Sequence, residues 1–157
     1  MSDKAIQDFY SDDIAICYGC GKNNSKGLQI KTFWEGEEGV CHFKPLAHHT
    51  AFPGVAYGGL IASLIDCHSI GTAVAAAYEA EGREPGTDPE ITFVTGTLKV
   101  TYLKPTPIDA ELTLRAKVTE MHGKRIEISC AVLANGSQTA QGDVTTIRAP
   151  RNLGLKG

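Results

Sequence analysis

The stretch HTAFPGVAYGGLIASLIDCHSIGTAVAAA, residues 49–77, decides the fold. A glycine pair, Gly58-Gly59, opens into the longest apolar run of the chain, and Asp66 is the only charged residue in it. The run predicts a helix to about residue 79 that is apolar on nearly every side, and such a helix is buried. A carboxylate inside it is costly unless it is paired, protonated or used in chemistry. Asp66 is therefore the first candidate for a functional residue.

Length and composition favour one soluble domain over residues 1–157. A chain of 157 residues buries roughly two-thirds of its unfolded surface. The net charge is −3 and no basic block occurs, so we expect no nucleic-acid partner. The polar, acidic start MSDKAIQDFYSDD has no signal-peptide core, so a cytoplasmic location is expected. The apolar run is about long enough to cross a bilayer. However, it carries Asp66, His68 and Thr72, and no membrane span or membrane partner is expected.

The cysteines give no complete metal site. Their count is odd, and without a signal peptide reduced thiols are expected. The pair Cys17-x-x-Cys20 lies in a Gly- and Asn-rich loop; a turn with two small buried thiols is favoured, with two zinc ligands or a redox pair as alternatives. The only candidate second pair is Cys41-His42, whose side chains would point to opposite faces of a strand. No metal and no cofactor are therefore predicted.

Alternation of apolar and polar residues predicts the sheet. Two strands, residues 28–34 and 40–43, form a hairpin before the helix. After the helix, four strands are expected in a meander, with the turn Asn135-Gly136 as its strongest hairpin signal. The class is α+β, with one long central helix wrapped by a curled antiparallel sheet of about six strands. Residues 1–16 form an arm or short helix, and residues 148–157 form a tail. Because the helix is apolar on most sides, we expect a second subunit to cover part of it.

Several motifs, in order, resemble those of the hotdog-fold acyl-CoA thioesterases, especially the phenylacetate-pathway and THEM-type branch. The resemblance spans roughly residues 17–147. It rests on the following segments: the loop Cys17-Tyr-Gly-Cys20-Gly with Asn24 and Gly27-Leu28; His49-x-x-Phe52-Pro53-Gly54-Val55-x-Tyr57-Gly58-Gly59; Leu64-Ile65-Asp66; Tyr102-Leu-Lys-Pro105-x-Pro107; and Gly123-Lys-Arg125.

The resemblance implies roles for individual residues in hydrolysis of an acyl-CoA or acyl-carrier thioester. Asp66 would attack the thioester carbonyl or activate water, and the Gly58 N–H would donate to the oxyanion. Thr95 resembles a polar residue that a neighbouring subunit contributes to the site. The family's sites lie at dimer interfaces, and dimers often pair into tetramers, so a homodimer or homotetramer is expected. The substrate-binding candidates are His49, Tyr57, Gly59, Leu60, Lys104 and Arg125.

These roles make physical sense without the family name. Thioester hydrolysis needs a nucleophile or base and donors for a developing oxyanion. The first N–H groups of a helix are such donors, and glycine lets an acyl group approach them. Partial burial would raise the pKa of Asp66, and a nearby hydroxyl would offset the rise. Lys104 and Arg125 could meet the phosphates of CoA.

The sequence departs from the family pattern at two positions. Tyr57 stands where the family usually has histidine, and Ala51 replaces a small polar residue or glycine. His49 or His48 could take over the histidine's role, or they could simply pack on the glycine turn. A Cys67–His68 nucleophile is disfavoured because adjacent helix residues point about 100° apart; a buried thiol and a core histidine are expected instead.

Each functional assignment has a structural alternative. Asp66 could pair structurally within an interface, Thr95 could be an ordinary strand residue, and Lys104 and Arg125 could be solvated strand-end cations. Two other functions compete with hydrolysis. One is an acyl-thioester-binding protein without turnover. The other is a hydratase or dehydratase, which needs a histidine–carboxylate pair to move a proton at carbon.

Overall fold

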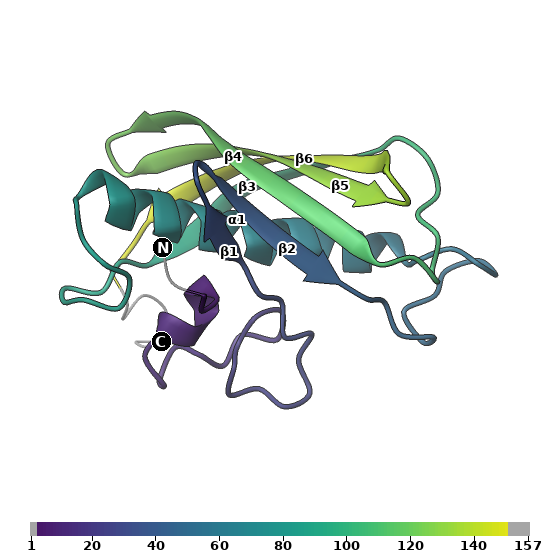
Figure 1. The fold of residues 1–157 in the computed structure, drawn as a ribbon, viewed down its shortest axis with the longest axis horizontal. Helices are drawn as coiled ribbons and strands as arrows, with labels where there is room; N and C mark the ends of the chain where they lie inside the picture. The colour runs from purple at the N-terminus through teal and green to yellow at the C-terminus, as the bar shows by residue number, and fades with distance from the viewer. Residues whose placement is uncertain (1–2, 151–157) are drawn as a thin grey trace.

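The computed structural model describes residues 3–150, in which one long helix packs on one antiparallel sheet (Figure 1). The helix, α1, runs over Gly58–Ala80. A single short 3-10 helix, η1, covers Ile6–Phe9 near the start of the described chain. The strands are β1 (Phe33–Glu35), β2 (Glu38–Phe43), β3 (Phe93–Tyr102), β4 (Leu112–His122), β5 (Arg125–Ala134) and β6 (Ser137–Arg148). The α+β class, the long helix and the six-stranded sheet predicted from the sequence are confirmed.

The strand order is β1-β2-β4-β5-β6-β3, and every neighbouring pair is antiparallel. The sheet curls around one side of α1 (Figure 1). The predicted meander is correct only for β4, β5 and β6. The first strand after the helix, β3, pairs with β6 and not with β4, so β3 is an edge of the sheet. A hydrophobic pattern identifies a strand but does not identify its neighbour.

The strand pattern follows from side-chain alternation. In β5, every second residue from Ile126 to Ala134 is buried against the helix, while those between are only partly covered. The turn between β5 and β6 is built by Asn135 and Gly136, both with positive φ, 52° and 78°. Positive φ at both central residues is what a tight two-residue hairpin turn needs. This hairpin prediction is confirmed.

The first predicted hairpin strand is mostly wrong. Only Phe33–Glu35 forms β1, and residues 28–32 lie outside any strand. Gln29 has a positive φ of 58°, which breaks the extended backbone. The segment pairs instead with the cysteine loop, through Leu28 N–H to the Tyr18 carbonyl and Ile30 N–H to the Gly19 carbonyl. A tertiary contact has replaced the strand that the local alternation indicated.

The far side of α1 is covered by the chain's own N-terminal segment, residues 3–32. Figure 1 shows this segment, in purple, below the helix and away from the sheet. Ile6 and Ile30 are fully buried there. The helix is long and apolar enough to cross a membrane by length and composition, yet 72% of its most apolar window is buried. Its all-round apolarity is thus explained within one chain, and it gives no argument for a second subunit.

A buried polar network holds the N-terminal segment and β2 to the helix. His68 on α1 donates from Nε2 to the Gly39 carbonyl at 3.0 Å, and its Nδ1 lies 2.9 Å from Thr32 Oγ1. Thr32 Oγ1 also accepts from Gln7 Nε2 at 3.1 Å. Because a carbonyl only accepts, Nε2 carries a proton; burial keeps the ring neutral, so that Nδ1 accepts from the Thr32 hydroxyl. Burial lowers the pKa of His68 to about 4.

Candidate active site

Asp66 meets Thr95 where α1 passes the edge strand β3. Thr95 Oγ1 donates a hydrogen bond to Asp66 Oδ1 at 2.5 Å. The register of β3 shifts between Thr95 and Thr97, which leaves Gly96 as the extra residue of a bulge. A bulge re-aims the side chains beside it. The resemblance implied that Thr95 comes from a neighbouring subunit; the structure corrects this, because both residues belong to one chain.

The two residues open onto a cavity of about 330 Å³ between α1, β3 and the N-terminal segment. Its walls are largely apolar, with Ile14, Ile70, Val74, Phe93 and Val94 among them. A cavity of this size with few convergent polar groups is typical of a small-molecule site. Asp66 and Thr95 are therefore placed where an apolar group could lie against them.

The cavity changes the acidity of Asp66. Burial raises the pKa of this carboxyl; the hydrogen bond from Thr95 lowers it, and the nearby Cys17 raises it further. The net effect is a raised pKa, as expected from the sequence. A carboxylate that is more basic than free aspartate is better suited to take a proton from water.

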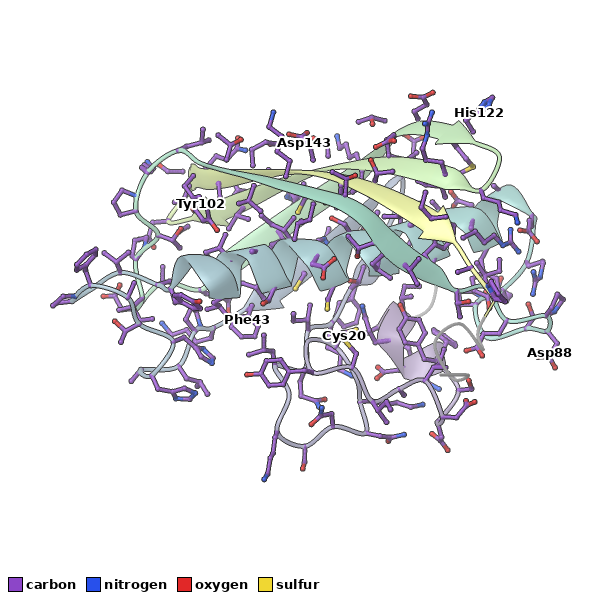
Figure 2. The ribbon with its side chains drawn as sticks, turned by 180° about the vertical axis from the view of Figure 1, so that it is seen from behind. Cys20, Phe43, Asp88, Tyr102, His122 and Asp143 are labelled. Carbon is purple, nitrogen blue, oxygen red and sulfur yellow. The ribbon has the colours of Figure 1, made fainter. Side chains whose placement is uncertain are left out.

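Three thiols in the same cavity were not predicted as a group. Cys17, Cys20 and Cys67 line the wall beside Asp66, with all three sulfur atoms within 4.8 Å of one another. Figure 2 shows Cys20 on the side of α1 away from the sheet. The sequence signal is the Cys17-x-x-Cys20 spacing, but the second pair that the sequence offers is Cys41-His42, which is not part of this cluster. The third thiol is instead the neighbour of Asp66 in the sequence.

The N-terminus of α1 forms a separate region. Gly58 lies in another cavity, of about 370 Å³, together with Ile61, Tyr102 and Lys104. Tyr102 donates from its hydroxyl to the Gly58 carbonyl at 2.7 Å. The first bonds of the helix, from Leu60 and Ile61 N–H, both go to the Tyr57 carbonyl, so the N–H groups of Gly58 and Gly59 precede the hydrogen-bonded ladder.

One chain does not bring Gly58 and Asp66 together. Asp66 follows Gly58 by eight residues, which is about 12 Å along a helix axis. An attacking oxygen and an oxyanion donor must both lie within about 3 Å of one carbonyl group. The two proposed catalytic groups therefore serve different cavities within a single chain.

The other residues at the helix N-terminus differ in their exposure. Tyr57 is 58% exposed, and its ring lies against Gly59, where a Cβ would come within 2.3 Å of it. His49 accepts the Leu46 N–H at Nδ1, at 2.9 Å. Burial, with a smaller effect of His48, lowers the pKa of His49. Leu60 is buried in the core and lines neither cavity.

The two candidate phosphate-binding cations lie apart. Lys104 is exposed and lines the Gly58 cavity. Arg125 lies 3.3 Å from Glu127 and 3.7 Å from Glu120. It starts β5 opposite His122, which Figure 2 places at the other end of the molecule from Tyr102. Lys104 is therefore the better placed of the two to meet a substrate at the helix N-terminus.

His68 cannot act on a substrate in this structure. It is fully buried, and both ring nitrogens are used by Thr32 and Gly39. The prediction of a core histidine is confirmed, and a Cys67–His68 nucleophile is not formed.

A cavity of about 620 Å³ elsewhere is lined by Glu35, Glu37, Glu38 and Glu79. Such an acidic lining is unsuited to the anionic phosphates of CoA.

A long helix wrapped by a curled antiparallel sheet is the hotdog architecture. Residues 53–141 match the family model described as the thioesterase superfamily. The chain belongs to the thioesterase superfamily, which confirms the resemblance noted in its motifs.

Individual relatives agree with this assignment. The chain is 37% identical to a thioesterase superfamily protein from Shewanella loihica PV-4; the match covers 92% of this chain and 99% of that one, with a TM-score of 0.69. It is 26% identical to the acyl-coenzyme A thioesterase THEM4 of Rattus norvegicus, over 77% of this chain and 47% of the relative. The chain spans about half the length of the curated relatives it matches.

A third similarity concerns the fold alone. A hypothetical thioesterase protein from Streptococcus pneumoniae TIGR4, solved with coenzyme A, is 16% identical. The match covers 77% of this chain and 89% of that one, with a TM-score of 0.63.

Proposed function

We propose that this protein hydrolyses an acyl-CoA thioester, with Asp66 as nucleophile or general base. The observation that carries the proposal is a half-buried carboxylate, bonded to Thr95, facing an apolar cavity in a thioesterase-superfamily chain. The similarity to THEM4 and to a protein solved with coenzyme A supports an acyl-CoA substrate.

The chemistry has two routes through the same carboxylate. As a base, Asp66 takes a proton from water while the water oxygen bonds to the thioester carbon, and the CoA thiolate leaves. As a nucleophile, Asp66 bonds to that carbon itself, expels the thiolate and leaves an anhydride for water to cleave. Both routes pass through an oxyanion that needs N–H donors. The raised pKa of Asp66 favours its action as a base.

A second copy of the chain would supply those donors. Thr95, which contacts Asp66, lies near one end of β3. Tyr102, which contacts Gly58, lies at the other end. Figure 2 shows β3 along the near edge of the sheet, with Tyr102 at one end. An unpaired edge strand is a template for another strand. Two β3 strands pairing antiparallel about a two-fold axis would bring the Asp66 end of one chain to the Gly58 end of the other.

The exposed side chains of β3 support this pairing. Val94 and Leu98 are both more than a third exposed, although strand residues of this type usually pack against a neighbour. We therefore propose a homodimer with two sites, each made of Asp66 and Thr95 from one copy and Gly58 from the other. Assembly of dimers into tetramers and a cytoplasmic location stay predictions.

Thioester absorbance over a panel of acyl-CoA substrates tests the hydrolysis. Asp66→Asn should lower kcat/KM by roughly 10²–10⁴-fold, the usual effect of losing a catalytic acid or base. Asp143→Asn is the matched control, because Asp143 lies on β6, outside both cavities. Equal hydrolysis by wild type and Asp66→Asn would refute the role of Asp66. Tight acyl-CoA binding without turnover by the wild type would favour the binding protein instead.

Mixing two inactive variants tests the shared site. Gly58→Pro removes one N–H at the first helical position, where proline is well tolerated. Tyr57, with φ −62° and ψ 132°, already has the extended conformation that precedes proline. Co-expressed Asp66→Asn and Gly58→Pro chains should recover about a quarter of wild-type activity, since random pairing gives half mixed dimers with one intact site each. No recovery would mean that each site comes from a single chain.

The hydratase alternative lacks its histidine. Of the two nitrogens of His68, neither faces the cavity of Asp66, since both are bonded in the core. His49 belongs to the loop before α1, and its Nδ1 is bonded to backbone. Water addition to an enoyl-CoA by the wild type would overturn this reasoning.

A further inference from the structure

Cys17, Cys20 and Cys67 come from two distant parts of the chain and converge on one point. Their sulfur atoms all lie within 4.8 Å of one another, and those of Cys17 and Cys67 are 3.9 Å apart. Zinc–sulfur bonds of about 2.3 Å in a tetrahedron separate the sulfur atoms by about 3.8 Å. The spacing of this pair thus matches an edge of a zinc–thiolate tetrahedron without any movement.

The loop that carries the first two cysteines is shaped around the sulfur atoms. Gly21 N–H closes the turn onto the Cys17 carbonyl at 2.8 Å. A Cβ at Gly19 would lie 2.3 Å from the Cys67 sulfur, so only glycine lets the loop close over that thiol.

The charges in the cavity lack a cation. Cys17, Cys20 and Cys67 line this cavity together with Asp66. Asp66 is the one carboxylate among the described lining residues, and none of them is a lysine, arginine or histidine. A divalent cation held by the thiols would balance the negative charge of Asp66 beside it.

The hydroxyl of Tyr10 is another polar group beside this cavity. It lines the cavity, it is buried, and it has no hydrogen-bond partner among the described residues. Buried polar atoms in native proteins almost always have a partner. A water molecule on a metal ion held by the thiols would give this hydroxyl its missing bond.

We propose that Cys17, Cys20 and Cys67 bind one zinc ion, with the fourth position open to the cavity for water. Soft thiolate ligands in a tetrahedral arrangement select zinc. Binding displaces the remaining thiol protons to solvent. The ion would fasten the cysteine loop to α1 one residue from Asp66. This site does not depend on the proposed hydrolysis.

The alternative use of these thiols is a disulfide. A disulfide needs sulfur atoms about 2.05 Å apart, it would use two of the three thiols, and it would leave the third without a role. The 3.9 Å spacing and the convergence of all three groups favour the metal.

Metal binding by the reduced, full-length protein tests the proposal. Metal-free protein titrated with Co²⁺ in the presence of a reductant should develop a thiolate-to-cobalt charge-transfer band. Zn²⁺ should abolish this band by displacing Co²⁺, at one ion per chain. Cys17→Ser should weaken zinc binding by at least the 10–100-fold that outer-shell changes already cause. Because Cys17 is exposed, we expect this variant to retain the fold. Cys130→Ser is the control, because Cys130 is buried outside the cluster, and its band should match the wild type.

Three results would overturn the site. The first is the lack of any cobalt band in folded, reduced protein. The second is an equal band in wild type and Cys17→Ser. A Cys17–Cys67 disulfide in protein that takes up no metal after reduction would also overturn it, in favour of a redox pair.

Discussion

The buried His68 makes the stability of this protein depend on pH. Its pKa is about 4 in the folded protein, against about 6.5 in an unfolded chain. Below pH 6.5 the unfolded chain takes up a proton that the folded protein refuses, so the free energy of unfolding falls as the pH falls. The difference of about 2.5 pKa units corresponds to about 3 kcal/mol of unfolding free energy. This contribution is fully present above pH 6.5 and is lost by pH 4.

Urea unfolding between pH 4 and 6.5 measures this loss. Trp34 is the single tryptophan of the chain and is buried, so its fluorescence reports the transition. His68→Gln, which keeps an amide donor for Gly39, should flatten the pH dependence relative to wild type. His42→Gln, an exposed histidine on β2, controls for titration at the surface. If the free energy of unfolding fell equally steeply with pH in wild type and His68→Gln, the neutral, buried imidazole would be refuted.

Three further predictions concern the site and its support. Thr95→Val should move the acid limb of the kcat/KM profile to higher pH, because the lost hydrogen bond was lowering the pKa of Asp66. Gly39→Ala should cost about 1–3 kcal/mol of stability by urea unfolding, since its Cβ would lie 2.1 Å from Thr72 Oγ1. Lys104→Ala should raise the KM for acyl-CoA, most at low ionic strength, because Lys104 is an exposed cation beside the Gly58 cavity.

Each of these has its own control. Thr95→Ser keeps the hydroxyl and should keep the wild-type profile; a shift equal to that of Thr95→Val would contradict the bond. Adding Thr72→Ala to Gly39→Ala removes the clashing oxygen and should regain part of the stability; no gain would argue against this contact. A KM that is independent of salt in both wild type and Lys104→Ala would exclude a charge interaction there.

The parts of the fold that could be predicted are those set by local patterns. The apolar run predicted α1, and Asn135-Gly136 predicted its hairpin, because only residues that tolerate positive φ build that turn. The pairing of β3 with β6 could not be predicted, since alternation marks a strand's two faces and leaves its edges unspecified. Residues 28–32 alternate like a strand, yet they bind the cysteine loop.

The candidate site could be predicted only in part for the same reason. Asp66 stood out because a charge in a buried helix is costly. Its contact with Thr95 joins residues 29 positions apart in sequence, and the resemblance assigned that contact to another subunit. The meeting of Cys17 with Cys67 spans 50 positions. No spacing rule reaches that far, so the thiol cluster could emerge only from the folded chain.

The N-terminal segment beneath α1 bears on where this domain begins. The family match starts at residue 53, yet Ile6, Gln7 and Ile30 are among the most deeply buried side chains. A chain trimmed to the matched region would strip α1 of its cover on one side, remove β1 and β2, and separate Cys67 from the cysteine loop. The region matched by the family model is therefore smaller than the unit of folding, and a boundary drawn at residue 53 cuts through the hydrophobic core.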